Sequence, residues 1–278
     1  MAMPYDRRDG RRAVNTLAPK LILTPLLVAS TSVAGRRWGP ALSGWLVALP
    51  LTSGPIALFI ALESGADVAR QAAAGSLLGA SAQVAFAAGY TIAARRLGPG
   101  PSLAVAALAF FAVGFAVPPL PPIVMYALLI VSVAVFLVTL GRRSSQVRRT
   151  MTPPAWDIPA RVIVATVLVV VISSLAPVIG GRFAGILATF PVYAAVLATF
   201  AHVTHGPGEA SDVLRGLATG LLGFGAFFLA LGYLLGMTGI ALSFAGALAV
   251  GCVVQAATLP LVRRATPDEE PMEPAGLE

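Results

Sequence analysis

The chain carries the same pattern of residues in both halves, and such a repeat constrains the fold more than any single residue does. Gly44 lies six residues before Pro50 in an apolar run, and Gly185 lies six before Pro191 in another. Downstream, each half has an Asp-Val-x-Arg sequence and then a glycine five residues on. These positions are Asp67, Val68, Arg70 and Gly75 in the first half, and Asp212, Val213, Arg215 and Gly220 in the second.

The two parts of the pattern are spaced differently. The offset in numbering between the two Asp/Arg pairs exceeds the offset between the two Gly/Pro pairs, and an insertion of about four residues near Thr204–Gly208 would reconcile them. We therefore expect two related copies, at 36–80 and 177–224. In a membrane protein, interrupted helices at matched positions of two halves point to a central binding site.

Composition places the chain in a membrane. Hydrophobic residues make up 57% and charged residues 11%, with a mean hydropathy of +0.85, whereas soluble domains carry about 25% charged residues. We expect an all-α polytopic integral membrane protein of about nine helices, each near the length that spans a bilayer. Their expected ranges are 21–35, 40–62, 69–94, 102–118, 122–140, 160–180, 183–203, 212–235 and 238–262.

The expected organisation follows from these helices. A basic tail (1–20) precedes a first membrane repeat (21–118), a connecting transmembrane helix (119–140), a polar cytoplasmic linker (141–159), a second membrane repeat (160–262) and a disordered acidic tail (263–278). An odd number of helices before the second copy reverses its direction, so the repeats should be inverted.

The arginines agree with this topology. If the 36–37 loop is cytoplasmic, most other arginines fall on the same side and only Arg70 and Arg182 fall outside, which is a positive-inside bias. One conflict is that a spanning first helix leaves the basic tail outside; 21–35 is short, so it could instead cross incompletely. The expected location is a bacterial inner membrane. The arginines placed inside are Arg95, Arg96, Arg142, Arg143, Arg148, Arg149, Arg215, Arg263 and Arg264.

The proline-containing helices are the candidate solute site. Proline removes a backbone donor and breaks the helix, which frees carbonyl groups, and in lipid these must find protein, water or ligand partners. Facing breaks near the midplane would suit a neutral, zwitterionic or weakly anionic solute; the alternative is that the prolines only shape packing. The candidate substrate-binding residues are Pro50, Thr52, Ser53, Gly54, Thr189, Pro191 and Tyr193.

The Asp/Arg pairs have two interpretations. Ser64-x-x-Asp67 resembles a capping box, and aspartate is favoured near a helix N-terminus, so helix capping is the preferred role. Gating at the two membrane surfaces is the sharper alternative. The residues concerned are Asp67 and Arg70 in the first copy and Asp212 and Arg215 in the second, where Ser211 or Glu209 could cap.

Other polar residues stand within or beside apolar helices. His202 and His205 are the only histidines; we favour a solvated loop for them, with proton coupling or a metal site completed by Glu209 or Asp212 as alternatives. Gln83, Tyr90 and Gln255 are expected to hydrogen-bond a neighbouring helix rather than to line a cavity. Gly75, Gly79, Gly220 and Gly223 permit close helix packing, and the single cysteine, Cys252, is interpreted as a small packing residue.

Several activities are disfavoured by missing motifs. There is no Walker A sequence, no His-Glu-x-x-His and no Gly-x-Ser-x-Gly, so we expect neither an enzyme nor a cofactor. The net charge of +7 does not indicate nucleic acid, because the arginines sit singly or in pairs at helix ends. The expected partners are the lipid bilayer and a small solute, with a homo-oligomer or an envelope-synthesis partner as further possibilities.

The segments Gly44–Pro55 and Gly185–Tyr193 resemble the GlpM-type family of small bacterial inner-membrane proteins. That family has a helix with a Gly-x-x-Pro-x-x-Pro-Thr-like sequence followed by a glycine-rich helix. The resemblance implies a fusion of two such units, one inverted, and a link to envelope polysaccharide production. The longer break at Thr52–Pro55 departs from the family pattern.

Three functions remain open from the sequence. A transporter or permease of a small solute, with its site between the second and seventh helices, is preferred. A non-transporting accessory or scaffold protein of envelope polysaccharide or lipid synthesis is the alternative. A lipid-handling enzyme or flippase would need a charged head-group site, for which the arginines are too peripheral.

Overall fold

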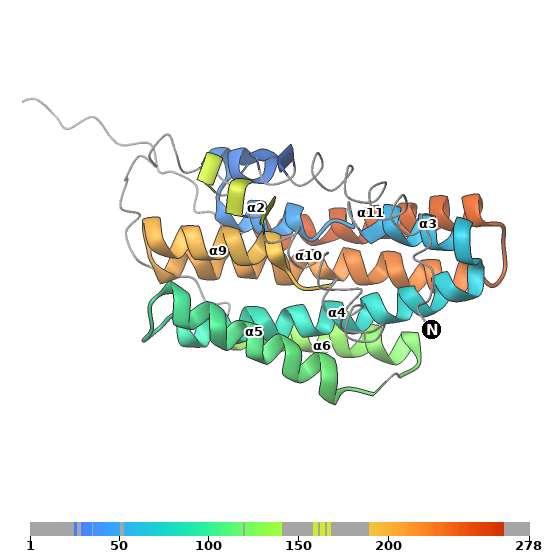
Figure 1. The fold of residues 1–278 in the computed structure, drawn as a ribbon, viewed down its shortest axis with the longest axis horizontal. Helices are drawn as coiled ribbons and strands as arrows, with labels where there is room; N and C mark the ends of the chain where they lie inside the picture. The colour runs from blue at the N-terminus through green and yellow to red at the C-terminus, as the bar shows by residue number, and fades with distance from the viewer. Residues whose placement is uncertain are drawn as a thin grey trace, which may run out of the picture.

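The regular structure of the chain is helical throughout the part that the structure, a computed structural model, describes: residues 25–26, 29–34, 36–50, 53–118, 120–140, 158–160, 162–164, 166–167 and 189–263. The all-α expectation is confirmed for these residues. The main helices (Figure 1) are α2 (Pro40–Val47), α3 (Ser53–Ser64), α4 (Ala66–Ala93), α5 (Pro99–Ala116), α6 (Pro122–Thr139), α9 (Val192–His205), α10 (Pro207–Leu234) and α11 (Ile240–Arg263).

Five of these helices are long and apolar enough to cross a membrane: α4, α5, α6, α10 and most of α11. Apolar side chains on α5, α6 and α11 face outward, with Leu108, Val138 and Val253 each about 70% exposed. Such a surface suits hydrocarbon, so the helices indicate a multi-pass membrane protein. The nine expected spans are not all confirmed, because 40–62 is divided into two short helices and 168–188 lies outside the described residues.

The two longest helices, α4 and α10, pack against each other at the centre of the bundle. They run in opposite directions, because Arg70 near the start of α4 donates a hydrogen bond from Nε to the carbonyl of Gly232 near the end of α10, at 3.2 Å. In Figure 1, α2, α3 and α11 lie on one side of this pair, while α5 and α6 lie on the other. The pair is therefore the scaffold on which the remaining helices are placed.

Equivalent elements of the two halves are matched closely. Helices α4 and α10 are each 28 residues long, and each follows a single glycine that joins it to the preceding helix. These glycines, Gly65 and Gly206, have the same offset in numbering as Pro50 and Pro191, and they share nearly the same backbone angles (φ 90°, ψ 167° and φ 96°, ψ 178°). This region is essentially accessible to glycine alone, so each glycine forms a sharp elbow between two helices.

The constant offset shows that the expected four-residue insertion near Thr204–Gly208 is wrong. Gly98 and Gly239, which precede α5 and α11, keep the offset of the two elbows. Asp67 is the second residue of α4, whereas Asp212 is the sixth residue of α10. The two Asp-Val-x-Arg sequences are therefore displaced by about one helical turn and do not occupy equivalent positions.

The described arginines gather at one end of the bundle. A methyl group at Gly44 in α2 would meet the carbonyl of Val213 near the start of α10, so the Arg36–Arg37 pair lies toward that end. Arg95 and Arg96 follow α4, whose last turn lies beside the last turn of α9. Helix α11 returns antiparallel to α10, which brings Arg263 to the same end, while Arg70 lies at the other. This distribution agrees with the expected positive-inside bias.

Candidate functional site

The first half contains a real break in its helix, as the prolines predicted. Helix α2 ends at Val47 and α3 begins at Ser53. The backbone N–H of Leu49 turns to the carbonyl of Leu46 at 3.2 Å rather than to that of Trp45, its partner in a continued α-helix. The Trp45 carbonyl is thereby released from the helical hydrogen-bond ladder.

A glutamine from α11 forms a hydrogen bond to this carbonyl. Nε2 of Gln255 donates to the Trp45 carbonyl at 3.1 Å. The Trp45 indole N–H donates to Oγ1 of Thr258 at 3.0 Å, and that hydroxyl donates to the Gln255 carbonyl at 2.8 Å. The expectation that Gln255 bonds a neighbouring helix is confirmed. Sequence reasoning missed Trp45 and Thr258; the signal for Thr258 was a hydroxyl within an apolar helix.

The orientation of the Gln255 amide is settled by its partner. A carbonyl oxygen cannot donate, so the amide nitrogen must face Trp45 and Oε1 must point the other way. Oε1 lies against Gly223 of α10, where a side chain would collide with it, and it has no hydrogen-bond partner among the described residues. Gln255 is only 3% exposed, so a buried acceptor without a conventional donor lies beside the break.

In the second half, the described chain resumes at a turn around Pro191, which is called the second break below; residues 168–188 before it lie outside the described part. Thr189 and Phe190 form a turn, and α9 begins directly after Pro191. The N–H of Ala195 donates to the Pro191 carbonyl at 2.8 Å, and the N–H of Gly54 donates to the Pro50 carbonyl at 2.9 Å. Donor and acceptor are displaced by the same offset in numbering, so the backbone closes in the same way after each proline.

Each break lies against the long helix of the other half. A methyl group at Gly220 of α10 would lie 2.6 Å from Cβ of Ala48 in the first break. A methyl group at Gly79 of α4 would lie 2.6 Å from Cβ of Thr189 in the second. Gly79 and Gly220 differ in residue number by as much as Gly65 and Gly206 do, and so do Ala48 and Thr189. The packing of the two breaks is therefore reciprocal. The expected role of Gly79 and Gly220 in close packing is confirmed.

An aromatic residue of each long helix also lies beside a break. The Phe86 ring of α4 meets the Phe190 ring edge-on, with centroids 5.7 Å apart. Its equivalent in α10, Phe227, places Cζ 3.7 Å from the position of a methyl group at Gly54. The expected site between the second and seventh helices is thus rearranged: the first break is backed by α10, the second by α4, and α4 and α10 pack together.

The candidate site residues are divided among these places. Pro50, Ser53 and Gly54 belong to the first break, and Thr189 and Pro191 to the second. Tyr193 belongs to a second apolar cluster that contains Val162, Val196 and Phe200, whereas Phe190 packs on the main core. Thr52 lies outside the described residues.

The Asp/Arg pairs do not form the expected capping boxes. The residue before α4 is Gly65 and the one before α10 is Gly206, and neither helix has a side-chain cap hydrogen bond. Ser64 still belongs to α3, so the capping-box prediction is wrong. Ser211 donates to the Pro207 carbonyl within α10 instead.

The two Asp/Arg pairs also differ from each other. Arg70 lies 3.6 Å from Asp67, with side chains 50% and 91% exposed, and such pairs stabilise by less than about 1 kcal/mol. Asp212 and Arg215 are the sixth and ninth residues of α10, whereas Asp67 and Arg70 are the second and fifth residues of α4. A gating role for the four residues stays a prediction.

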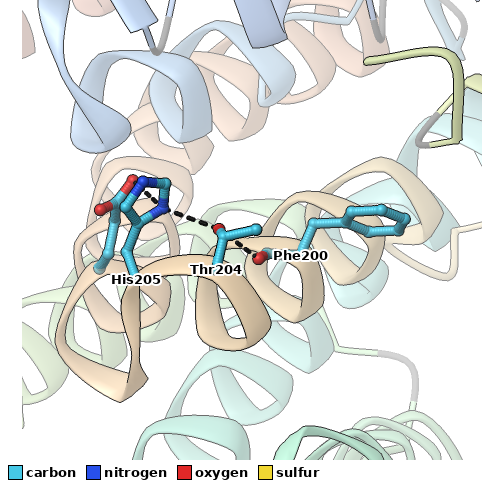
Figure 2. A network of polar contacts seen from close by, with 4 residues as sticks. Phe200, Thr204 and His205 are labelled. Carbon is cyan, nitrogen blue, oxygen red and sulfur yellow. Dashed lines mark hydrogen bonds and ion pairs between the residues drawn. The ribbon is translucent and has the colours of Figure 1, made fainter. Parts of the chain in front are cut away.

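The histidines lie in a helix and not in a solvated loop, so that interpretation is wrong. His205 ends α9, and its Nδ1 lies 2.7 Å from the Thr204 hydroxyl and 3.4 Å from a carboxylate oxygen of Glu209 (Figure 2). The hydroxyl donates its single proton to the Phe200 carbonyl at 2.7 Å, so it accepts from Nδ1–H. No group of three or more metal-ligating side chains occurs in the described part of the chain.

One cleft, of about 430 Å³, lies between α4, α5 and α6, away from the breaks. Its lining is apolar except for hydroxyl groups of Ser81, Ser132 and Thr139. Cys252 was interpreted as a packing residue but is exposed on α11. Neither feature adds polar chemistry to the candidate site.

No family model, no curated protein and no solved structure matches the chain. The resemblance to GlpM-type proteins therefore stays a hypothesis.

Proposed function

We propose that this protein is a membrane transporter or permease of a small solute, built from two inverted repeats. The observation that carries the proposal is the reciprocal packing of two proline breaks on the long helices of opposite halves. The contact of Gly79 with Thr189 and the contact of Gly220 with Ala48 join positions that are related by one constant difference in residue number. Paired interruptions at matched positions of two repeats are where many secondary transporters place their binding site.

The directions of the two longest helices support inversion. Helices α4 and α10 are equivalent in length and position, yet they run antiparallel. A two-fold axis in the membrane plane relates helices in this manner, and such repeats provide alternating access in many secondary transporters. The proposed pathway runs along the seam of α4 and α10, where both breaks are reached.

The solute class follows from the groups beside the breaks. They offer backbone carbonyls, the Gln255 amide and hydroxyl groups, and the helices that back them carry no charged side chain near Gly79 or Gly220. A buried charge needs a paired partner. A neutral or zwitterionic solute, such as a polyol, sugar or amino acid, therefore fits best.

The first test is topology. In a Cys252→Ser background, single cysteines at Ala66 and Gly208 report the starts of α4 and α10. With an impermeant thiol reagent on intact cells, we expect Ala66→Cys to react and Gly208→Cys to react only after permeabilisation. Equal labelling of both positions would mean parallel repeats and would remove the alternating-access argument.

The second test is flux. Radiolabelled polyols, sugars and amino acids are added in turn outside proteoliposomes, and protein-free vesicles provide the control. We expect uptake of one class, and a loss of at least tenfold in the doubly substituted Pro50→Ala, Pro191→Ala protein, because alanine lets the helices continue. Unchanged flux in that variant would exclude the breaks as the site. An absence of flux for every solute, together with co-purification of a glycosyltransferase, would favour the accessory function.

A further inference from the structure

A buried polar pair joins α4 to α9 at the end of the bundle where the arginines gather. Tyr90 has no exposed surface, and its hydroxyl lies 3.2 Å from Nδ1 of His202. The two rings meet edge-on with centroids 5.9 Å apart. His202 is only partly buried, so it connects a fully buried phenol to the aqueous side.

A third residue completes the arrangement. Thr199 lies one helical turn before His202, beside the Tyr90 hydroxyl. Its own hydroxyl oxygen is buried and has no well-formed hydrogen bond among the described residues. The Tyr90 hydroxyl can donate either to His202 or to the unused Thr199 oxygen. This arrangement suits both protonation states of His202.

We propose that His202, Tyr90 and Thr199 form a proton-binding site that couples protonation to the conformation of the bundle. With neutral His202, the Tyr90 hydroxyl donates to Nδ1 and the imidazole proton resides on Nε2. When a proton adds at Nδ1, that N–H donates to the Tyr90 oxygen, and the phenolic O–H turns to Oγ1 of Thr199. One proton is gained and no covalent bond is broken.

The surroundings of His202 allow it to carry charge. Helices α2 and α5, which contact α9, contain no titratable side chain, and neither do Val162, Ile163 and Val164. Helix α4 presents Tyr90, with Arg95 and Arg96 beyond its end, and α10 presents Glu209 and Asp212 in its first two turns.

On α9 itself, His205 is engaged by Thr204 and Glu209. A cation in the last turn of a helix is stabilised by the helix dipole. The C-terminal position of His202 in α9 and the carboxylates of Glu209 and Asp212 favour a charge on its imidazole, whereas Arg215 of α10 and the other arginines that gather at this end oppose it.

The Gly206 elbow, which follows α9, links the protonation of His202 to the conformation of the bundle. The N–H of Gly206 donates to the carbonyl of His202 at 3.1 Å, so a change in the last turn of α9 reaches the joint with α10 directly. If the protein is a transporter, as proposed above, the site gives it proton coupling from the arginine-rich side. Proton coupling of transport depends on the proposed function, whereas the proton site itself does not.

The first experiment observes the proton directly. The chain has two histidines, so His205→Gln leaves His202 as the only one, and ¹⁵N-histidine NMR of the protein in nanodiscs reports its tautomer. We expect a single neutral tautomer protonated on Nε2, which gains a second ring proton as the pH falls. Tyr90→Phe should mix the tautomers and Thr199→Val should weaken proton binding. The same tautomer and titration in all three proteins would overturn the site.

The second experiment tests coupling over a distance. The labelling rate of Ala66→Cys, at the opposite end of the bundle, is compared at about pH 6 and about pH 8 in the Cys252→Ser background. His202→Gln should remove a several-fold part of the pH dependence, whereas His205→Gln, the matched control, should keep it. Because the thiol is the same throughout, its own ionisation cancels.

The outcomes separate this inference from the proposed function. Equal pH dependence with and without His202 would overturn coupling even if solute flux is found. Conversely, loss of the pH dependence in His202→Gln without flux of any solute would support the proton site and reject transport.

Discussion

Replacing Gly216 by alanine is expected to destabilise the folded protein by about 3 kcal/mol or more, at the upper end of the range for overpacked cores. A methyl group there would collide with the backbone carbonyl of Ala41 and approach the Trp45 nitrogen within 2.9 Å. Backbone atoms cannot rotate away as a side chain can, so α2 and α10 would have to separate. The measurement is the thermal unfolding midpoint of purified protein in one detergent.

The control is a glycine on the same helix. A methyl group at Gly232 would meet only Cβ of Ala73, at 3.9 Å, which is an ordinary contact. Gly232→Ala should therefore be neutral or stabilising, because alanine favours a helix over glycine by up to about 1 kcal/mol. Equal midpoints for the two variants would contradict the tight α2–α10 contact.

Replacing Gln255 by leucine is expected to cost about 1–3 kcal/mol, the penalty for a buried polar group left without its partner. The Trp45 carbonyl, released by the proline break, would lose its donor at 3.1 Å, and hydrocarbon offers no replacement. The readouts are the unfolding midpoint and the protease sensitivity of the first break.

A second glutamine provides the matched control. Gln83 also stands in an apolar helix and is 9% exposed, but it makes no hydrogen bond in the part of the chain that the structure describes. Gln83→Leu should change the midpoint little. If both leucine variants have the same midpoint, the hydrogen bond from Gln255 to the Trp45 carbonyl does not stabilise the first break.

Local chemistry made much of the fold predictable. The apolar run lengths anticipated α4, α5, α6, α10 and α11 to within a few residues, because each must match the bilayer. Pro50 predicted the break between α2 and α3, since a missing N–H disrupts the helix wherever the rest of the chain lies. The matched Gly/Pro spacing predicted two repeats, and this stays a prediction.

The alignment of the two halves and the contacts between helices could not be predicted from the sequence in the same way. The Asp-Val-x-Arg sequences suggested an insertion, because four residues are about one turn and place both motifs on the same helix face; the elbows at Gly65 and Gly206 set the true alignment. Contacts between positions far apart in the sequence, such as Gln255 with Trp45 and Tyr90 with His202, depend on how helices cross. The sequence thus specified where helices form and break, through interactions within a few residues. Which helix covers each break, and which buried donors and acceptors meet, followed from the packing of α4 on α10.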